Sequence, residues 1–448
     1  MAPGVRLAIE GRSASRSARE QVGFKEHELR RQVVREMHLR RFPEFALPAD
    51  ITQWVKLIDA SEREMEHSQV LAMPAVPQQD ASGHRRHVAG LGAEGLRISW
   101  ERHSEASTTT LIRSGVPALP NNWTDHPGGD AAAAVEWAEK LPGSVIRATR
   151  ILIVADDESA RPVLEAAEFL ESDLVSCHVA GGARIWTDFR IHGDDYGRMV
   201  IAANGLLPGD LARCVQRLQE LGNYRNMALL GLPLAQENWA RLDALERALD
   251  EAGRAQSSPD LRDDDLLLDI SRLSAALLTV TTQCGYRMSA TAAYAEIVTS
   301  RLAELDVRPI AGFHSLIDFT DRRFKPAVRT CATLTARLDA LNERAGRFTA
   351  MLRTRVETRI ENQNGRLLAS LDRSAKTQLR LQHLVEGLST VAISYYALSL
   401  LAYPVRAAGH YWPDMSEYVV LGAAMPIVVA AVFLFMSALR RRLTNGGD

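Results

Sequence analysis

The feature that most constrains this chain is a proline-free stretch that leads into two apolar segments near the C-terminus. No proline occurs between Pro326 and Pro404, and the apolar segments cover residues 387–405 and 418–439 without a charged side chain. Proline ends or kinks a helix, so its absence permits one very long helix here. About 20 apolar residues suffice to cross a bilayer. The sequence therefore predicts a long helix that enters a two-helix transmembrane hairpin, residues 387–442.

The residues that flank the two segments favour a membrane hairpin over a pair of buried core helices. Aromatic residues, which prefer the membrane interface, gather at one end of the pair: Tyr403, Tyr411, Trp412 and Tyr418. Basic residues lie at the other end: Arg373, Lys376, Arg380, Arg440, Arg441 and Arg442. The loop between the segments carries one Arg or Lys, Arg406. Because basic residues stay on the cytoplasmic side, we expect both termini in the cytoplasm.

The stretch before the hairpin has the spacing of a coiled-coil seam. Its apolar residues follow one another at intervals of 4-3-4-3-4: Leu334, Leu338, Leu341, Ala345, Phe348 and Leu352. The next steps lead from Leu352 to Gln363, a shift of 11 residues that locally unwinds a heptad supercoil. Such a helix needs partners, either the helical pattern at 266–305 or other copies of the chain. We expect a homo-oligomer through residues 326–386.

The composition of the whole chain is typical of a globular protein. The 448 residues are 46% hydrophobic and 24% charged, which favours two or three structural units. A formal net charge of −2 shows no basic excess, so no nucleic-acid partner is expected. Four scattered cysteines without a CxxC pair indicate buried thiols in a reducing compartment. Residues 1–21 lack a signal-peptide core. Their Arg and Ser content is similar to that of a transit peptide, but Glu10 and Glu20 favour a disordered tail.

Residues 22–230 predict an α+β cytoplasmic head, and residues 231–386 a helical stalk without convincing strands. Strands are predicted at 51–58, 96–103, 108–112, 145–155, 174–179, 184–191 and 198–202. Helices are predicted at 22–41, 131–141, 160–170 and 208–227. The last three strands suggest an antiparallel meander in a mostly antiparallel or mixed sheet, with helices to one side. Residues 73–95 read as a loop. Ser61 and Asp130 are expected to cap helices.

Two short clusters are candidates for chemistry. Glu36, His38 and Arg40 could bind an anion or supply a general base, but helical residues two apart diverge, which favours a helix end docked by salt bridges. In the second cluster, Trp100, Arg102 and Ser104 should share one face of a strand. Its opposite face would carry a possible metal-binding triple, or simply an edge strand's paired charges: Glu101, His103 and Glu105.

Hydroxyl groups continue into the first apolar segment, at Ser389, Thr390, Ser394 and Tyr395. Such groups usually bond to a neighbouring helix or to their own turn, and a pore lining is the alternative. No phosphate-binding loop, HExxH, GxSxG or dinucleotide GxGxxG motif occurs. We therefore expect no catalytic residue and no cofactor, and the metal question stays open.

Six runs of the sequence form a recognisable set: Glu36–Pro43, Trp100–Glu105, Tyr224–Ala235, Ser289–Tyr294, Met351–Val356 and Val385–Tyr396. This set resembles a family of uncharacterised, membrane-anchored bacterial proteins, domain-of-unknown-function family 3422. The chain departs from the family pattern at Arg41, where proline is usual, and at Ala106, where an aromatic residue is usual. The resemblance implies a bacterial inner-membrane protein without an established activity.

The layout is also similar to that of CorA-type magnesium channels, which have a cytoplasmic head, a long helix that becomes the first span, and a basic C-terminus. Those channels carry a Gly-Met-Asn signature where this chain has residues 403–406, and a cation at Arg406 would oppose cation entry. We hypothesise a non-enzymatic, oligomeric sensor or interaction module. The alternatives are a CorA-like ion channel, which ion flux lost on substitution of Ser394 would reveal, and an enzyme that uses Glu101, His103 or His38.

Overall fold

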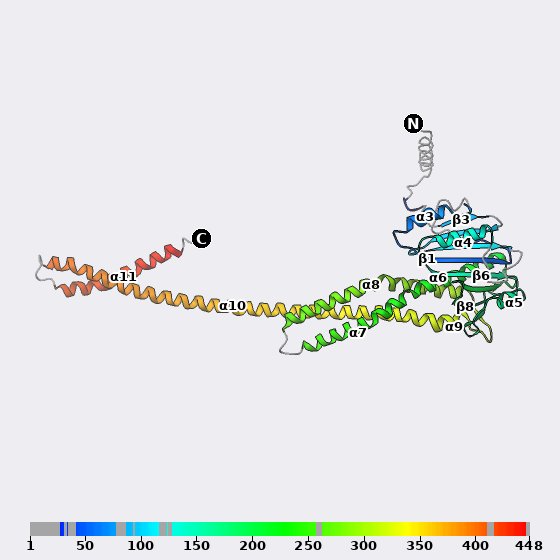
Figure 1. Cartoon of the computed structure of the whole chain (residues 1–448). Coiled ribbons are helices and arrows are strands. Elements are labelled where there is room, and N and C mark those ends of the chain that lie inside the picture. Colours follow the sequence, from blue (N-terminus) through cyan, green and yellow to red (C-terminus); the bar gives the residue numbers. More distant parts are fainter. Residues whose placement is uncertain are drawn as a thin grey trace, which may run out of the picture. The chain divides into compact units, whose positions relative to one another are not determined.

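The computed structural model describes residues 27–30, 34, 42–77, 87–92, 95–115, 123, 128–256, 262–409 and 416–444. It divides into two compact units (Figure 1). The head unit contains Met1–Asp250 and Leu273–Arg344, and the stalk unit contains Glu251–Arg272 and Ala345–Asp448. The predicted tail at 1–21 and most of the predicted helix at 22–41 lie outside the described residues.

The head unit is built on one mixed sheet with the strand order β10-β7-β8-β9-β6-β1-β5-β4-β3-β2. The strands are β1 (Ala49–Leu57), β2 (Val76–Pro77), β3 (His87–Leu91), β4 (Arg97–Arg102), β5 (Ala106–Ser114), β6 (Ser144–Val154), β7 (Val175–Val179), β8 (Ala183–Ile191), β9 (Gly197–Ala202) and β10 (Arg308–Pro309). Only the β6–β9 pair among them is parallel. The predicted strands and the β7–β8–β9 meander are confirmed.

Helices cover both faces of this sheet, so the expectation of helices to one side is wrong. Successive residues of β6 point to opposite faces: Ile151 and Ile153 join one core, and Leu152 joins another. The first core is completed by α6 (Pro208–Leu229), α8 (Asp263–Glu304) and α9 (Leu316–Phe319). The other face packs against α3 (Arg63–Leu71), α4 (Asp130–Lys140) and α5 (Asp157–Glu165). Burial on both faces is why β1 and β6 are apolar without clean alternation.

Four local predictions are corrected. Residues 73–95 contribute β2 and β3, because β3 pairs with β4, a contact that the local pattern does not show. Strand β4 therefore has neighbours on both sides, β3 and β5, so the expectation of an edge strand at residues 100–105 is wrong. Helix α3 has Glu62 rather than Ser61 at its N-cap, without a side-chain cap bond. Helix α4 has Gly129, at φ 62°, as its N-cap, and Asp130 is its first residue. A side-chain cap does form on α5, where Asp156 accepts from the backbone N–H of Ser159 at 2.8 Å.

The long helix predicted from the proline-free stretch is confirmed as α10, which runs from Lys325 to Gly409 and continues through Pro404. Helix α11 (Glu417–Thr444) follows it. Both α10 and α11 contain a stretch that is long and apolar enough to cross a membrane. A π-helical turn, Thr320–Phe324, precedes α10 and joins it to α9.

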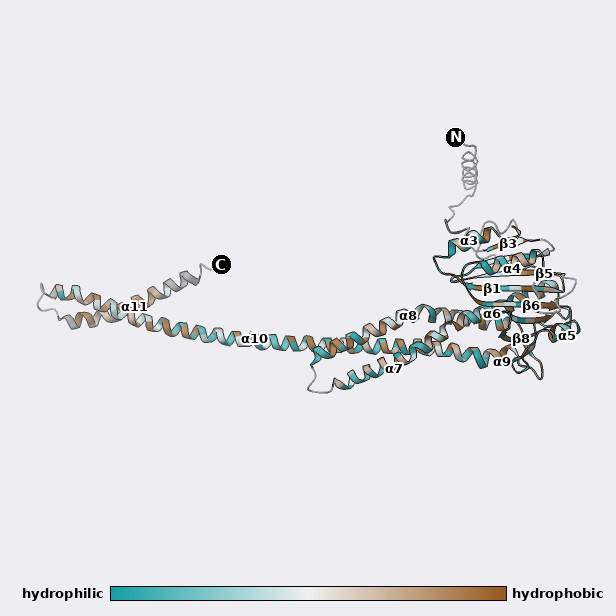
Figure 2. Ribbon diagram, viewed as in Figure 1, coloured by the Kyte–Doolittle hydropathy of each residue, from teal (hydrophilic) through white to brown (hydrophobic). Residues whose placement is uncertain are grey.

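Helices α7 (Gly231–Ala255) and α8 cover the first part of the predicted seam on α10 (Figure 2). In the head unit, Leu334, Leu338 and Leu341 are buried, and Asn342 Nδ2 on α10 donates to Thr281 Oγ1 on α8 at 3.0 Å. In the stalk unit, Leu352 is buried and Arg359 pairs with Asp263 at 2.7 Å. The chain's own helix is therefore the partner up to Leu352, the first of the two predicted alternatives. Residues 357–385 are exposed throughout.

Candidate functional site

A cavity of about 810 Å³ lies in the head unit against strands β1, β3, β4 and β5 and helices α6 and α8. Side chains from four separate motif runs line it. The run at 100–105 supplies Glu101, Arg102, His103 and Ser104; the other runs supply Phe42 and Pro43, Tyr224 and Met227, and Tyr294. Segments far apart in sequence therefore converge on one site of a size typical for small-molecule binding.

His103 is positioned by the end of β4 and by an aromatic stack. Its Nε2 lies 3.1 Å from Thr108 Oγ1 on the neighbouring strand β5. Its ring meets Tyr224 of α6 edge-on, at 6.4 Å between centroids, and Tyr224 stacks on Tyr294 of α8 at 5.7 Å. The imidazole and two phenols thus form one wall of the cavity.

Glu105, in the turn between β4 and β5, is held by α8. Arg287 donates to its two carboxylate oxygens at 2.9 and 2.7 Å, and the Tyr294 hydroxyl donates to Oε1 at 2.9 Å. The carboxylate is thus bound by Arg287 and Tyr294. Among the residues that the structure describes, no three His, Cys, Asp or Glu side chains are grouped to hold a metal ion. This arrangement does not support the metal-binding alternative for Glu101, His103 and Glu105.

Burial raises the pKa values of the two tyrosine hydroxyls in this wall, Tyr224 and Tyr294. Burial, reinforced by the nearby Glu105 carboxylate, raises the pKa of Tyr294 to about 12, and burial also raises the pKa of Tyr224. Both phenols therefore remain hydrogen-bond donors near neutral pH. Gln219 Nε2, buried beside the cavity, has no hydrogen-bond partner among the described residues. The cavity thus combines donors, cations and an aromatic surface suited to binding a polar ligand.

Trp100 has a structural role on the other side of β4. It is fully buried, and its Nε1 donates to Glu66 Oε1 of α3 at 2.9 Å. The guanidinium of Arg102 lies over the Trp100 ring at 5.2 Å and donates to Arg63 O at 2.9 Å. The predicted face-sharing of Trp100 with Ser104 is wrong because β4 ends at Arg102, where alternation stops, and Ser104 lines the cavity.

The remaining predicted residues lie elsewhere. Glu36, His38 and Arg40 are outside the described residues. Three hydroxyls on α10 bond back to carbonyl oxygens one turn earlier: Ser389 to Val385 at 2.8 Å, Thr390 to Glu386 at 2.9 Å and Ser394 to Thr390 at 2.7 Å. These bonds match the expectation that such hydroxyls bond to their own helical turn. Tyr395 is largely exposed beside Tyr396.

The sequence alone does not predict the α6 and α8 side of the cavity. Tyr224 and Tyr294 stand in the family-like runs, whereas Gln219 and Arg301 stand in none of them. The position of each tyrosine in such a run is the one signal in the sequence, and nothing local shows that the two rings stack.

Comparison with known proteins agrees with the motif runs. The family model described as "Protein of unknown function (DUF3422)" matches residues 25–443. No curated protein and no solved structure matches the chain. Because the match covers nearly the whole sequence, the chain belongs to the DUF3422 family of proteins of unknown function.

Proposed function

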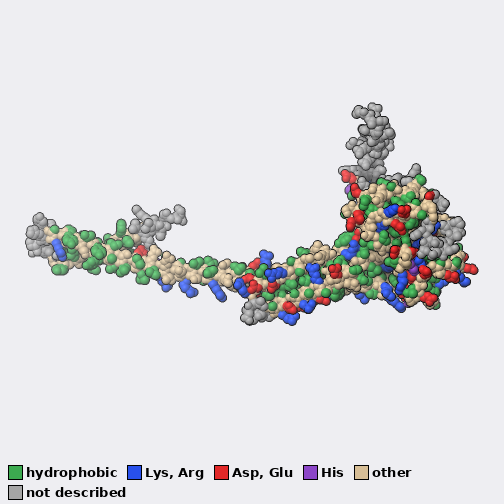
Figure 3. All heavy atoms as spheres, viewed as in Figure 1, with side chains coloured by type: hydrophobic (Ala, Val, Ile, Leu, Met, Phe, Trp, Pro, Cys, Tyr) green, Lys and Arg blue, Asp and Glu red, His purple; other side chains and the backbone are tan. Residues whose placement is uncertain are grey.

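We propose that this protein is a two-span protein of the bacterial inner membrane, with both termini in the cytoplasm, that senses a ligand or partner through its head and assembles through α10. The observation that carries this proposal is exposed apolar surface. Only 6% of the apolar window of α10 and 0% of that of α11 is buried inside the chain. Figure 3 shows many hydrophobic side chains, and few charged ones, over the apolar end of α10 and over α11. A bilayer would cover that surface.

A second exposed apolar surface supports self-association of α10. We call it the α10 stripe, defined as Ile360, Leu367, Leu371, Leu381, Val385 and Leu388. These residues fall near one face of a helix with 3.6 residues per turn, and each is at least half exposed. Arg366, Arg373, Lys376 and Arg380 lie on the other side of the helix. Such a face is stable in water only when covered, and a second copy presents the same face.

The width of the apolar surface bears on the kind of assembly. Leu368 and Leu379, which lie together along one edge of the α10 stripe, are also apolar and exposed. Two-stranded coiled coils usually carry charged residues at the flanking positions. An apolar flank widens the stripe and therefore favours an α10 that contacts two neighbours, as in a ring of more than two copies.

The motif cavity supports a binding role for the head. It gathers arginine, histidine, glutamate and tyrosine side chains from distant segments around one space. The imidazole of His103 contacts the hydroxyl of Thr108, and the nearby Glu105 carboxylate is bound by Arg287. We therefore propose recognition rather than catalysis, with no nucleic acid as partner.

Native mass spectrometry of the full-length protein, released from detergent micelles or from lipid nanodiscs, tests the assembly. We expect one dominant species with a mass of three or more chains, since the stripe and its apolar flank must be covered. A monomer that keeps the intact α10 would refute the proposal. A dimer would retain self-association but refute the argument from the apolar flank.

A further inference from the structure

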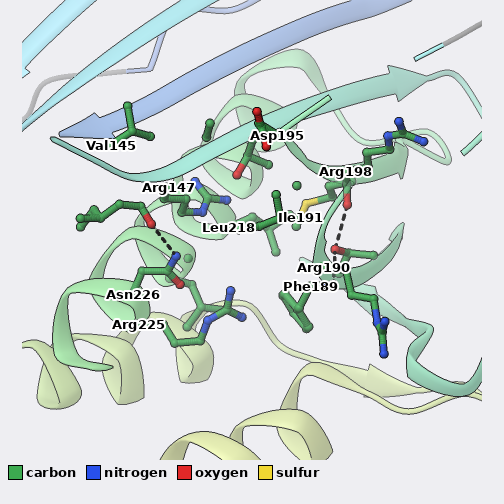
Figure 4. Close-up of a pocket in the computed structure, with 18 of the residues that line it drawn as sticks. Val145, Arg147, Phe189, Arg190, Ile191, Asp195, Arg198, Leu218, Arg225 and Asn226 are labelled. Atoms are coloured by element: carbon green, nitrogen blue, oxygen red, sulfur yellow. Dashed lines mark hydrogen bonds between the residues drawn. The ribbon is translucent and has the colours of Figure 1, made fainter. Parts of the chain in front are cut away.

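A second cavity, of about 320 Å³, lies on another part of the head unit, between the sheet and α6 (Figure 4). Its walls come from β6, β8, β9 and α6, with Leu316 of α9. Much of the lining is apolar, including Ile191, Met199, Leu218 and Leu221. Four arginines also line it, and two of them, Arg147 and Arg225, carry the argument that follows.

Arg147 reaches the cavity from β6 by passing close over α6 at Gly222. A Cβ at position 222 would lie 2.8 Å from the guanidinium carbon, so only glycine leaves room for the arginine. The side chain is 8% exposed, and its Nη1 donates to two neutral acceptors, Gln53 Oε1 at 3.1 Å and Asn223 Oδ1 at 2.8 Å. No carboxylate of the described residues pairs with it.

Arg225 lies one turn further along α6. Its guanidinium sits over the Phe189 ring at 4.2 Å and near the Phe319 ring at 5.4 Å. Among the described residues it makes no ion pair or hydrogen bond, and the aromatic faces are its partners. Stacking orients the planar group but leaves its N–H donors unused.

The other arginines of the same cavity differ in this respect. Arg190 pairs with Asp173 at 2.6 Å, and Arg198 pairs with Asp194 at 3.4 Å and Glu168 at 3.3 Å. Asp195 also lines the cavity and forms no ion pair with Arg147 or Arg225. Two cations therefore share a largely apolar space without an acidic partner, an arrangement that is costly unless an anion joins them.

The electrostatic consequence is visible in the acidity of the two groups. Burial, and the neighbouring charge of Arg225, lower the pKa of Arg147 to about 9, and burial lowers the pKa of Arg225 to about 10. Both guanidinium groups are still charged near neutral pH. A bound anion would offset the cost of burying each positive charge.

We propose that this cavity binds a small organic or inorganic anion whose carboxylate or phosphate oxygens are held by Arg147 and Arg225. Guanidinium groups match the geometry of both oxyanions, and the apolar walls admit a compact non-polar body on the ligand. Gln53 and Asn223, which hold Arg147, also line the 810 Å³ cavity. Substitution of Arg147 would therefore disturb both cavities, and Arg225 is the residue to test.

The first experiment is isothermal titration calorimetry of the full-length protein in detergent, with sodium phosphate and sodium butyrate as probes at constant ionic strength. Arg225→Met keeps the side-chain length and removes the charge. Arg190→Met is the matched control, since Arg190 lines the same cavity but is paired with Asp173. We expect Arg225→Met to weaken binding about tenfold or more and Arg190→Met to change it by no more than about twofold.

The two probes distinguish a phosphate site from a carboxylate site. No heat of binding for either probe with the wild-type protein, or equal losses in the two variants, would overturn the proposal. A second measurement needs no variant and covers the case in which Arg225→Met fails to fold. In the wild-type protein, the binding probe should slow modification of Arg225 by phenylglyoxal, mapped by mass spectrometry, while Arg190 reacts at an unchanged rate. Protection of neither residue, or of both equally, overturns it as well.

Discussion

At the scale of single residues, the carboxylate of Glu105 links the turn between β4 and β5 to α8. The side chain of Glu105 is 10% exposed and that of Arg287 is 21% exposed. The Arg287 guanidinium donates a hydrogen bond to each carboxylate oxygen of Glu105. The same carboxylate fixes Tyr294, which stacks on Tyr224 in the wall of the motif cavity. One charged residue thus holds both the α8 contact and the geometry of the candidate site.

Replacing Glu105 by Gln should destabilise the head by about 2–4 kcal/mol, because it leaves Arg287 largely buried without its carboxylate. Urea unfolding of the full-length protein in detergent, followed by tryptophan fluorescence, measures the loss. Glu136→Gln is the matched control, since its pair with Lys140 is exposed, and its unfolding midpoint should not move. Equal midpoints for Glu105→Gln and the wild type would contradict the assigned role.

Tyr294 predicts a pH dependence at the alkaline end. Its pKa is raised by burial and by Glu105 to about 12, whereas an unfolded tyrosine titrates near 10. Between those values the unfolded chain has released the proton and the folded chain retains it. The unfolded state then binds fewer protons, so stability falls as pH rises from about 10. Tyr294→Phe should reduce that fall by up to about 1.4 kcal/mol per pH unit. Urea midpoints between about pH 9 and 11 check this, and identical slopes would refute it.

At the scale of elements, α10 changes its surroundings along its length. Up to Leu352 most residues of the predicted seam are buried, and α7 and α8 of the same chain lie against this part of α10. From residue 357 the helix loses this cover, and the α10 stripe begins at Ile360. The predicted 11-residue shift from Leu352 to Gln363 coincides with this change. After this shift the apolar residues of α10 lie on a different side of the helix, so they can pack against a partner other than α8.

A single charge on the α10 stripe should disrupt assembly while the same charge on the other face should not. Leu367→Asp puts a carboxylate into the stripe, and Ala369→Asp puts one on the exposed face opposite. We expect light scattering after size-exclusion chromatography to give a smaller assembly for Leu367→Asp and the wild-type mass for Ala369→Asp. Two variants with the same mass would argue against the stripe as the contact.

At the scale of the whole molecule, the four cysteines make membrane orientation measurable without removing them. Cys177, Cys214, Cys284 and Cys331 are all buried, and burial raises the pKa of each thiol. The thiolate is the reactive form, so these residues should resist maleimides in the folded protein. Labelling of a single introduced cysteine then shows on which side of the membrane that cysteine lies.

Cysteine at Ala407, exposed at the end of α10, should react with a membrane-impermeant maleimide added outside intact bacterial cells. Cysteine at Ala369 should react only after the cells are opened, because positive-inside bias assigns that segment to the cytoplasm. Mass spectrometry of the purified protein reads the result. The reverse labelling pattern would invert the proposed topology, and labelling of both sites in intact cells would contradict a two-span arrangement.

The candidate site was partly predictable. The run from Trp100 to Glu105 marks it from sequence, but the partners of that run, Tyr224, Arg287 and Tyr294, stand on helices far along the chain. Hydrogen bonds and ring stacking across such distances depend on how the helices pack, and local periodicity carries no information about that packing. For the same reason the sequence indicated alternating faces at Ser104, whereas the turn after β4 rotates it into the cavity.

By itself, the sequence determined the features that depend on neighbours a few residues away. The long α10, the apolar windows of α10 and α11, and the strands of the sheet follow from proline absence and short-range hydrophobic period. Only the tertiary structure decided which segments meet: the β3–β4 pairing, helices on both faces of the sheet, α8 as the first partner of α10, and the convergence of four motif runs on one cavity. These contacts are long-range, and packing of side chains selects among the many pairings that the local pattern allows.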